Sequence, residues 1–429
     1  MRQTLFHIPH AFFGIPVLGF GWVLAALVLV AVIFLLTFRK KQSVMKLLEE
    51  QGVVWGVAAL IVVFLLPQIE ESISDGTSTP WIVGLPIRGY GVMLMLGVVS
   101  AMAVAMVRCD KAGLSREAFF SLATWTVVSG MIGSRVFYCV QYWNELGDTL
   151  GEKLWKSLQV TEGGLVVYGS VIGGLIAIAF WSRKNRFSLL KLADCVAPAF
   201  FIGLAFGRIG CFLNGCCYGG LCESSLPSIT FPSGSPAYID QMHSGGLFGI
   251  ETVADLDTDG TQPILKVKPD SWAAANHIQP GQKLVSIREM IVESRSRSDS
   301  LAAPVFEATI QVDSSQFQLG SNVVPKRSMP VHPSQIYAAI SGFVLFLWIC
   351  SLSAITKRTG LIIGVSIIAY GVQRIIEEII RVDEAGQFGT SLSIAQWISL
   401  AGILLGAGVA VMARPFVPLA TQSSRDVAL

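Results

Sequence analysis

Charged residues are scarce in this sequence, and histidines are few. Of the 429 residues, 14% are charged, whereas an average soluble domain has about 25%, and 52% are hydrophobic. This shortage of charge excludes an ordinary soluble protein and indicates an integral membrane protein. The net charge of +2 comes without a basic helix or a basic patch interleaved with aromatic residues, so no nucleic-acid partner is expected.

The histidines and cysteines do not follow the common metal-binding patterns. The five histidines are scattered without an HExxH pattern, which counts against an intramembrane metalloprotease. Cys211, Cys216, Cys217 and Cys222 are clustered, but their spacing matches neither a CxxC zinc site nor the usual iron–sulfur runs. We interpret them as small buried residues, with a disulfide through Cys222 as the alternative. Neither a metal nor another cofactor is expected.

Long apolar runs predict an α-helical polytopic membrane protein. A helix needs about 20 apolar residues to cross the hydrocarbon layer. About nine transmembrane helices are predicted, near residues 14–38, 52–67, 88–107, 118–142, 163–182, 194–213, 334–355, 360–380 and 392–413.

The distribution of lysine and arginine predicts the orientation. The odd-numbered connections hold most of these cations, namely Arg39, Lys40, Lys41, Lys46, Arg108, Lys111, Arg116, Arg183, Lys184, Arg186, Lys191, Lys357, Arg358 and Arg414. The short even-numbered connections hold Lys153, Lys156 and Arg381. Because cytoplasmic loops are enriched in these residues, the amino terminus is predicted to lie outside and the carboxyl terminus in the cytoplasm.

The motif GRIGCFLNGCCYG at residues 207–219 places an arginine at the end of an apolar run. A cation at that depth costs about 2.5–3.5 kcal/mol on insertion scales and is usually retained to meet an anion, an ion path or a partner charge. The glycines of the motif allow close backbone approach, and Asn214 adds an uncharged donor and acceptor. The motif therefore predicts that Arg208 lines a pocket for an anionic group.

Further polar residues lie in other apolar runs. Arg135 follows GMIGS, and the motif HPSQIY brings His332 and Gln335 to the start of a span. Tyr370, Arg374, Glu378 and Arg381 are spaced by four, four and three residues, which predicts one helix face. This row is either an internal ion-pair ladder or a site in which Glu378 orients Arg374 toward an anion.

Two glycine-rich segments have two interpretations each. GIPVLGFG at 14–21 and GLPIRGYG at 84–91 share their spacing, which predicts bent span entries unless the match is chance. GGLVVYGSVIGG at 163–174 contains small residues that allow close helix packing, or it contributes to a ligand site through Tyr168.

Hydropathy falls between residues 217 and 331, which predicts an extracytoplasmic insert. Residues 264–287 predict strand, turn, short helix, turn and strand, and they resemble the core of a PDZ-like module around 246–318. Such modules bind extended peptides at a sheet edge, so a peptide ligand is a candidate partner. Asp255, Asp257 and Asp259 are interpreted as a hairpin turn, because Lys266 replaces the glutamate of a calcium loop. Residues 294–300 predict an exposed loop.

Eight separated motifs, in order from about residue 84 to 413, resemble the prolipoprotein diacylglyceryl transferase family. They are RGYGVM with Tyr90, the segment with Arg135, GGLVVYGSVIGG, GRIGCFLNGCCYG, FPSGSPAY at 231–238, HPSQIY, YGVQRIIEEIIRVD and LSIAQWIS. The resemblance implies transfer of diacylglyceryl from phosphatidylglycerol to the lipobox cysteine of a bacterial prolipoprotein in the cytoplasmic (inner) membrane. It also implies a seven-helix core at 84–216 and 332–415, two extra helices in 1–83, the insert at 217–331 and a cytoplasmic tail at 416–429.

The resemblance also implies roles for single residues. Arg208 and Arg374 would be essential and would meet over one lipid head group. The remaining implied or candidate site residues are Tyr90, Arg135, Asn214, Gly219, His332, Gln335, Glu378 and Arg381. The sequence departs from the family at Tyr168, which replaces a histidine proposed as the base, and at Cys211 and Cys216, which replace asparagine and glutamate. We expect Tyr168 to position the head group or to relay a proton.

Two other classes of function fit parts of the pattern. A lipid or anion transporter would also use arginines within the membrane, and it would show flux without a covalent product. A receptor with a PDZ-like module would bind peptide with the arginines dispensable.

Overall fold

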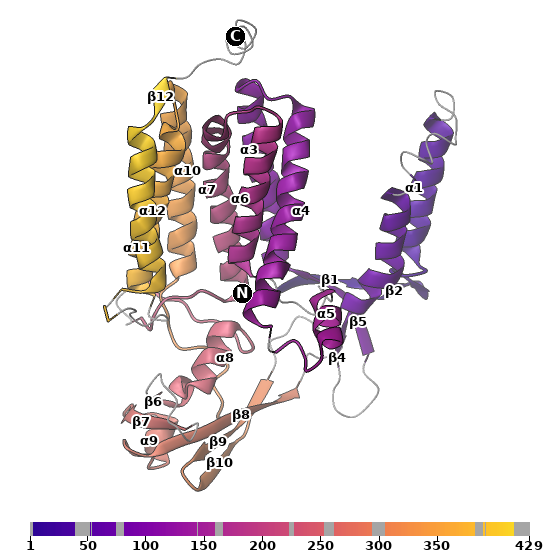
Figure 1. The fold of residues 1–429 in the computed structure, drawn as a ribbon. Helices are drawn as coiled ribbons and strands as arrows, with labels where there is room; N and C mark the ends of the chain where they lie inside the picture. The colour runs from indigo at the N-terminus through magenta and orange to yellow at the C-terminus, as the bar shows by residue number, and fades with distance from the viewer. Residues whose placement is uncertain are drawn as a thin grey trace, which may run out of the picture. The chain divides into compact units, whose positions relative to one another are not determined.

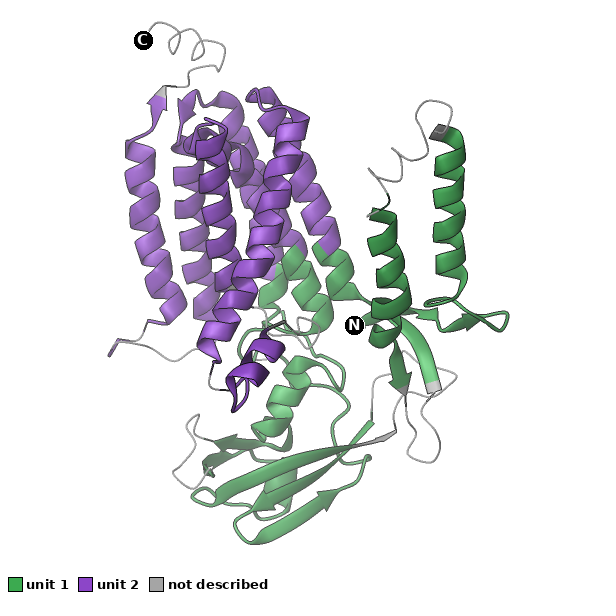
Figure 2. Cartoon of the chain, turned by 45° about the vertical axis from the view of Figure 1, so that its right-hand side comes forward, with its two compact units in different colours: residues 1–94, 207–336 green, residues 95–206, 337–429 purple. Residues whose placement is uncertain are grey.

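The computed structural model describes residues 3–38, 52, 54–73, 81–143, 145–158, 166–222, 227–252, 261–293, 305–381, 389–390 and 392–415. Figure 2 shows its two compact units: unit 1 comprises residues 1–94 and 207–336, and unit 2 comprises residues 95–206 and 337–429. Each unit is described by itself.

Unit 1 begins with strands. β1 (Thr4–Pro9) pairs antiparallel with β5 (Trp81–Arg88), which also pairs with β4 (Glu71–Ile73), and the two-residue strands β2 (Ala11–Phe12) and β3 (Ile15–Pro16) form a hairpin. Helix α1 (Trp22–Phe38) follows, and residues 54–69 are helical, ending in a π-helical turn and a 3₁₀ turn. Two side-chain hydrogen bonds connect this segment to the region of β4. His7 of β1 bonds to Glu71 of β4 at 3.0 Å, and His10, just after β1, bonds to Glu70, just before β4, at 2.7 Å.

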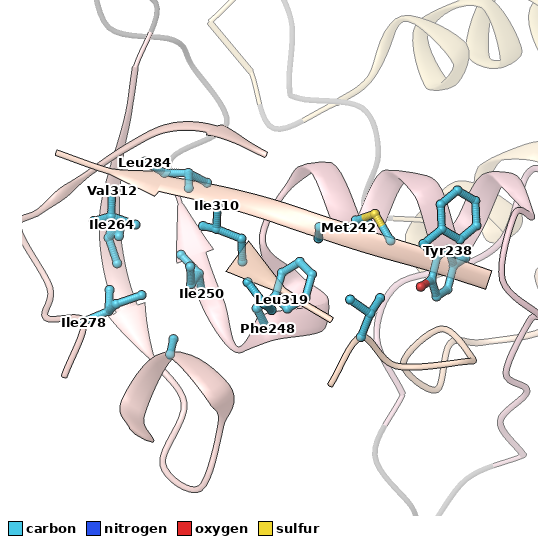
Figure 3. Packing of buried hydrophobic residues seen from close by; sticks show 14 residues of the cluster. Tyr238, Met242, Phe248, Ile250, Ile264, Ile278, Leu284, Ile310, Val312 and Leu319 are labelled. Carbon is cyan, nitrogen blue, oxygen red and sulfur yellow. The ribbon is translucent and has the colours of Figure 1, made fainter. Parts of the chain in front are cut away.

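The insert of unit 1 is an antiparallel sheet with two short helices. The strand order is β10-β9-β8-β7-β6, with β6 (Ile250–Thr252), β7 (Gln262–Val267), β8 (Lys283–Glu293), β9 (Val305–Val312) and β10 (Ser315–Leu319). Alternate residues of β9 are buried, as expected for a strand with one covered face. Figure 3 shows this core, where Met242 of α8 (Pro236–His243) packs with Phe248 and Ile310.

The predicted order within 264–287 is confirmed. β7 is followed by the short helix α9 (Trp272–Ala275) and then by β8. Ser271 caps α9 by accepting from the Ala274 N–H, a standard N-terminal cap. The insert is joined to the rest of unit 1 through a paired stem. Cys222 N–H donates to the Pro330 carbonyl at 3.0 Å, and residue 221 bridges residue 331.

Unit 2 is helical. Its elements are α3 (Gly89–Lys111) from residue 95, α4 (Arg116–Gln141), α5 (Leu150–Leu158), α6 (Val167–Lys184), α7 (Leu189–Asn214) up to residue 206, α10 (Ser334–Ile355) from residue 337, α11 (Leu361–Ile380) and α12 (Ile394–Val411), with the short strands β11 (Arg358–Thr359) and β12 (Arg414–Pro415). Among the described helices, α3, α7, α10 and α12 are long and apolar enough to cross a membrane, and segments 22–37 and 54–69 are apolar but shorter. The chain is therefore a helical, multi-pass membrane protein.

Glycines let the helices of unit 2 approach closely. α4 packs on α6 where a Cβ added to Gly133 would lie 2.4 Å from the Gly169 carbonyl oxygen. α11 and α12 run side by side (Figure 1), and a Cβ added to Gly406 would lie 2.7 Å from the Gly364 carbonyl oxygen. Small residues have this role in membrane helix pairs, where lipid gives no hydrophobic force between helices. The packing interpretation of GGLVVYGSVIGG holds for its described glycines.

One polar network fixes helices of unit 2 to each other. Arg108 donates to the carbonyls of Asp194 and Cys195 at 3.2 and 3.1 Å and to Ser353 Oγ at 2.7 Å. The Asp194 carboxylate accepts from the N–H groups of Gly360 and Ile363 at 2.6 and 2.8 Å. A carboxylate at the N-terminus of α11 satisfies donors that the helix itself leaves unpaired.

Several sequence expectations need correction or lie outside the described residues. The helix expected at 14–38 begins at Trp22, and the two GxPxxGxG segments contribute strands rather than bent helix entries, because residues 15–16 and 81–88 pair with other strands. Outside the described residues lie the turn at Asp255, Asp257 and Asp259, the loop 294–300, the tail 416–429, residues 163–165 of GGLVVYGSVIGG and the cations between 39 and 46.

The glycine contacts predict a matched pair of variants on α12. Gly406→Ala places a methyl group against the Gly364 backbone, whereas Gly408→Ala meets no atom within 4 Å. We expect Gly406→Ala to lower the free energy of unfolding by about 1–3 kcal/mol, because backbone cannot yield as a side chain can. Thermal unfolding in detergent measures the effect, and equal unfolding temperatures for the two variants would contradict the close packing.

Candidate functional site

The end of α7 folds back on itself in unit 1. The Cys211 carbonyl accepts from the N–H groups of Gly215 and Cys216, at 2.9 and 3.2 Å. Gly215 has a φ of +79°, and a Cβ there would lie 3.0 Å from a Phe231 ring carbon. Glycine suits both the left-handed backbone and the close approach. Cys217 follows with a φ of +55°. This turn places Cys216 and Cys217 beside Cys211, and the three Sγ atoms lie within 4.8 Å of one another.

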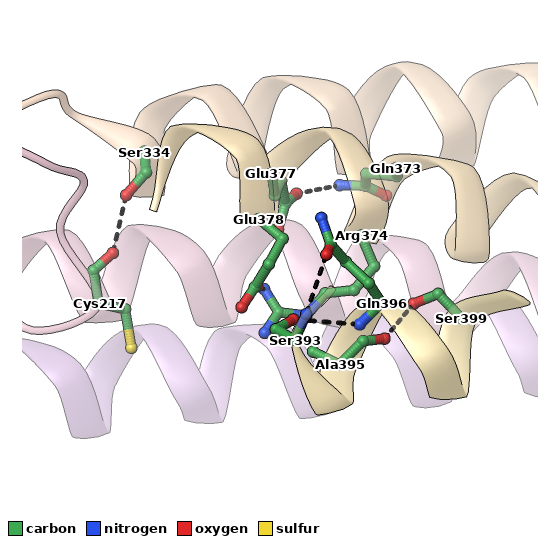
Figure 4. Close-up of polar contacts among 10 residues, drawn as sticks. All are labelled: Cys217, Ser334, Gln373, Arg374, Glu377, Glu378, Ser393, Ala395, Gln396 and Ser399. Carbon is green, nitrogen blue, oxygen red and sulfur yellow. Dashed lines mark hydrogen bonds and ion pairs between the residues drawn. The ribbon is translucent and has the colours of Figure 1, made fainter. Parts of the chain in front are cut away.

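The HPSQIY motif holds this turn from the other end of the insert. Ser334 Oγ donates to the Cys217 carbonyl at 2.8 Å, drawn in Figure 4, and Gln335 Nε2 donates to the Cys216 carbonyl at 2.7 Å. The Gly219 N–H donates to the His332 carbonyl at 2.9 Å. Gln335 is fully buried, and its Oε1 has no hydrogen-bond partner among the described residues. Residues far apart in the sequence thus meet at one turn.

The start of α3 lies against the end of α7 within unit 1. A Cβ added to Gly210 would lie 3.1 Å from Tyr90 Cδ2, so the glycine allows the tyrosine ring to pack there. Arg208 is half-buried and precedes Cys211 by three residues on the same helix, which puts both on one face.

Gln3, the residue just before β1, also belongs to this site, and sequence reasoning missed it. Gln3 Nε2 donates to the Asn214 carbonyl at 3.1 Å, and the Gln3 carbonyl accepts from the Gly89 N–H at 2.8 Å. Gln3 therefore joins the end of α7 to the start of α3. No local motif signals this role, because it depends on β1 pairing with β5 some 80 positions later.

Unit 2 contains the second group of candidate residues, on α11. Arg374 Nη1 lies 2.8 Å from Glu378 Oε2, and the two side chains are 16% and 5% exposed. Neither atom has the alignment of a hydrogen bond, so the contact is an ion pair whose donors keep their hydrogen-bonding capacity. Beside it, Gln373 Nε2 donates to Glu377 Oε1 at 2.8 Å, as Figure 4 shows. The same nitrogen also donates to Ser341 Oγ at 2.7 Å.

The predicted row of polar residues on α11 reaches the C-terminal end of the helix. The helix ends at Ile380, and Arg381 has an extended backbone with φ −91° and ψ 137°. Its N–H still donates to the Glu378 carbonyl at 3.2 Å, so Arg381 is the C-cap of the helix that carries Arg374 and Glu378. Tyr370 of the same row packs its ring on Phe200, with centroids 5.2 Å apart.

Arg135 and Tyr168 of unit 2 have different surroundings. Arg135 donates to the carbonyls of Lys156 and Ser157 at the end of α5, and its guanidinium lies 5.1 Å from the Tyr138 ring centroid. Cations commonly stabilise helix ends in this way. Tyr168 is the second residue of α6 and is 61% exposed.

The cysteine interpretation needs correction. Cys211, Cys216 and Cys217 are half-buried rather than fully buried and are clustered, whereas Cys222 is buried and carries a thiol instead of a disulfide. The C-x₄-C-C spacing did not predict this cluster, because the three thiols come together through the chain reversal at Gly215.

Comparisons with known proteins agree with the motifs. The model of the family described as "Prolipoprotein diacylglyceryl transferase" matches residues 80–412. A phosphatidylglycerol–prolipoprotein diacylglyceryl transferase of Rhodopirellula baltica is 36% identical over 434 residues, covering 93% of this chain and 87% of its own length. Proteins of the same name from Clostridium tetani and Bdellovibrio bacteriovorus are 25% and 27% identical, and each match covers 75% of this chain and 92% and 87% of theirs.

The contacts of Gln335 predict what its removal does. Gln335→Ala leaves the Cys216 carbonyl without its donor, so we expect a loss of about 1–3 kcal/mol of stability and faster labelling of Cys216 and Cys217 by a maleimide. The matched control is Gln316→Ala on the exposed face of β10. Unfolding temperature and mass spectrometry of the labelled cysteines are the measurements, and unchanged labelling would show that Gln335 does not hold the turn.

Proposed function

The chain belongs to the prolipoprotein diacylglyceryl transferase family, and from this premise we propose how its residues carry out the reaction. The chain is a multi-pass membrane transferase that moves the diacylglyceryl group of phosphatidylglycerol to the cysteine of a prolipoprotein during lipoprotein maturation. The observation that carries the residue assignment is the turn at the end of α7. Motifs around Tyr90, Arg208 and Gln335, scattered over the sequence, meet there.

The reaction sets two chemical requirements. A thiol displaces glycerol phosphate at carbon, so the thiol has to become a thiolate, although its ordinary pKa is about 8.5. The leaving phosphate develops negative charge, which has to be neutralised in a water-poor site. Arginine meets the second requirement, because its planar guanidinium stays charged and matches two phosphate oxygens at once.

Arg208 and Arg374 supply the positive charge in this proposal. Arg208 shares a helix face with the thiol turn and lies in the glycine-rich part of α7, where small residues allow a head group to approach. Arg374 is held by Glu378 through the 2.8 Å ion pair while its remaining N–H groups can donate to phosphate. Such preorganised donors are worth about 3–4 kcal/mol each in transition-state stabilisation.

The other candidate residues position the substrates or the site. Tyr90 and Asn214 lie at the meeting point of α3 and α7 and are proposed to contact the lipid head group. Gly219, His332 and Gln335 order the turn through the bonds described above. Arg135, which donates to the end of α5, and Arg381, at the C-terminal end of α11, remain candidate substrate contacts in this proposal.

Tyr168 is proposed to act on the head group rather than as a base. A phenol with a pKa near 10 is a poor base at neutral pH. Its exposed position at the start of α6 allows it to position a head group or relay a proton.

The finer architecture is part of the same proposal. We propose nine spans, seven of the family core and two in residues 1–83, in a bacterial inner membrane with the amino terminus outside. The insert would then face the compartment in which prolipoproteins present their cysteine. Its five-stranded sheet is proposed as a PDZ-like module at 246–318, which binds an extended peptide at a sheet edge.

The arginine assignment predicts a large loss of transfer in Arg208→Ala. We expect kcat/KM to fall by at least about 10²–10³-fold, because a donor to the leaving phosphate is removed. Arg208→Lys keeps the charge but not the bidentate geometry and should retain part of the activity. The assay is mass spectrometry of a lipobox peptide incubated with phosphatidylglycerol. Arg183→Ala at the exposed end of α6 serves as the control. Near-normal labelling of the peptide by Arg208→Ala would refute the assignment.

Tyr168 offers a second, independent test in the same assay. We expect Tyr168→Phe to slow transfer only a few-fold, since the hydroxyl positions substrate, and Tyr168→His to preserve transfer. Tyr142→Phe, at the end of α4, is the matched control. A complete loss in Tyr168→Phe would show that the hydroxyl is indispensable and that it takes part directly in proton transfer.

A further inference from the structure

Three thiols converge at the end of α7 in unit 1. The Sγ atoms of Cys211, Cys216 and Cys217 all lie within 4.8 Å of one another, and the three residues are half-buried. Their position is fixed by the backbone, through the Cys211 carbonyl and through the bonds from Ser334 and Gln335. Cys216 Sγ also donates weakly to the Cys211 carbonyl at 3.8 Å. Thiolates are soft ligands, which select zinc or copper(I) over magnesium or calcium.

The spacing of the sulfurs suits one zinc ion. Zinc–sulfur bonds are about 2.3 Å long, so sulfurs around one tetrahedral ion lie about 3.8 Å apart. Sulfurs within 4.8 Å of one another need to close by about an ångström or less, which rotation of the side chains can supply. Three protein ligands with an open fourth position are the arrangement of catalytic zinc sites, whereas structural sites have four.

We propose that Cys211, Cys216 and Cys217 bind one Zn²⁺ as thiolates, and that the fourth position of this ion takes the thiol of the prolipoprotein cysteine. The inference rests on the proposed function and deepens it, because it supplies the missing base. A thiol that coordinates a zinc ion is deprotonated. The ion thus generates the nucleophile without a histidine at position 168.

The chemical step balances with zinc as the added reactant. The substrate thiol loses its proton to water when its sulfur binds Zn²⁺. The thiolate sulfur then forms a bond to the glyceryl carbon while the carbon–oxygen bond to phosphate breaks, and the phosphate oxygen takes the electron pair. The product is a neutral thioether, which is a weak ligand and leaves the ion. Zinc neither gains nor loses electrons.

The charges of the site are consistent with this chemistry. Three thiolates and one Zn²⁺ carry a net charge of −1, and a bound substrate thiolate makes it −2. Arg208, one turn earlier on α7, offsets part of this charge. Without a metal, three neighbouring thiolates would repel each other, so the empty cluster holds protons and releases them on binding zinc.

Metal binding is tested on the full-length protein in detergent. Zinc sulfate is titrated against a competing chelator, with metal content by mass spectrometry and zinc K-edge absorption as readouts. We expect one zinc per chain with sulfur neighbours near 2.3 Å. Binding should be lost in Cys211→Ser and Cys216→Ser and kept in Cys139→Ser, whose thiol lies on α4. Zinc retained by the first two variants, no zinc in the reduced wild-type protein, or a disulfide within the cluster would overturn the site.

The pH profile of transfer tests the catalytic role. At pH 7 a thiol of pKa 8.5 is about 3% ionised, so removing zinc should slow transfer about 30-fold. The rate of the zinc-depleted enzyme should rise nearly tenfold per pH unit below pH 8, and that of the zinc-loaded enzyme should be nearly flat. Equal rates and profiles would refute zinc catalysis while leaving the transferase assignment intact. Zinc binding without transfer in any preparation would instead refute the proposed function.

Discussion

The site depends on two hydrogen bonds that the Cys211 carbonyl accepts, from the N–H groups of Gly215 and Cys216. They end α7 and reverse the chain at Gly215, so the residues that follow return over the last helical turn. Everything else in unit 1 that belongs to the site is attached to this reversal. Ser334 and Gln335 donate hydrogen bonds to the carbonyls of Cys217 and Cys216. Gln3 donates to the Asn214 carbonyl, and the Tyr90 ring packs on Gly210. Cys217, the one non-glycine residue of this turn with a left-handed backbone (φ +55°), keeps that conformation because several such contacts determine it together.

Membrane helices place different demands on their sequences than a soluble core does. In unit 2, close packing comes from glycines such as Gly133 and Gly406, and polar order comes from Arg108 and Asp194, which satisfy helix ends. These contacts leave the apolar surfaces of α3, α10 and α12 facing outward, as expected when the surrounding solvent is lipid. The helices of unit 2 are therefore stabilised by close packing at glycines and by hydrogen bonds at helix ends.

The sequence allowed much of the fold to be predicted, because long apolar runs and a strand–helix–strand pattern are local signals. The helix from 334 to 355 and the order β7, α9, β8 were foreseen from such patterns. The strands around 81–88 were not, since their pairing partner lies at residues 4–9. The same difference between local and long-range signals explains which site residues could be predicted. Arg208 and Gln335 can be recognised from the sequence because they are polar residues in apolar runs. The role of Gln3 depends on a long-range contact, and the clustering of the three thiols depends on a chain reversal, so neither could be predicted from residue spacing.

The paired stem between residues 219–222 and 330–332 has a consequence for how this family can vary. Because the chain leaves and re-enters unit 1 through neighbouring, hydrogen-bonded segments, the ends of the insert are already closed before its sheet begins. A sequence of almost any length can be carried between them, since lengthening a closed loop adds only about 0.6 kcal/mol per doubling. The stem is thus a natural point of domain grafting: evolution or an engineer could exchange the whole module there and leave the catalytic turn in register.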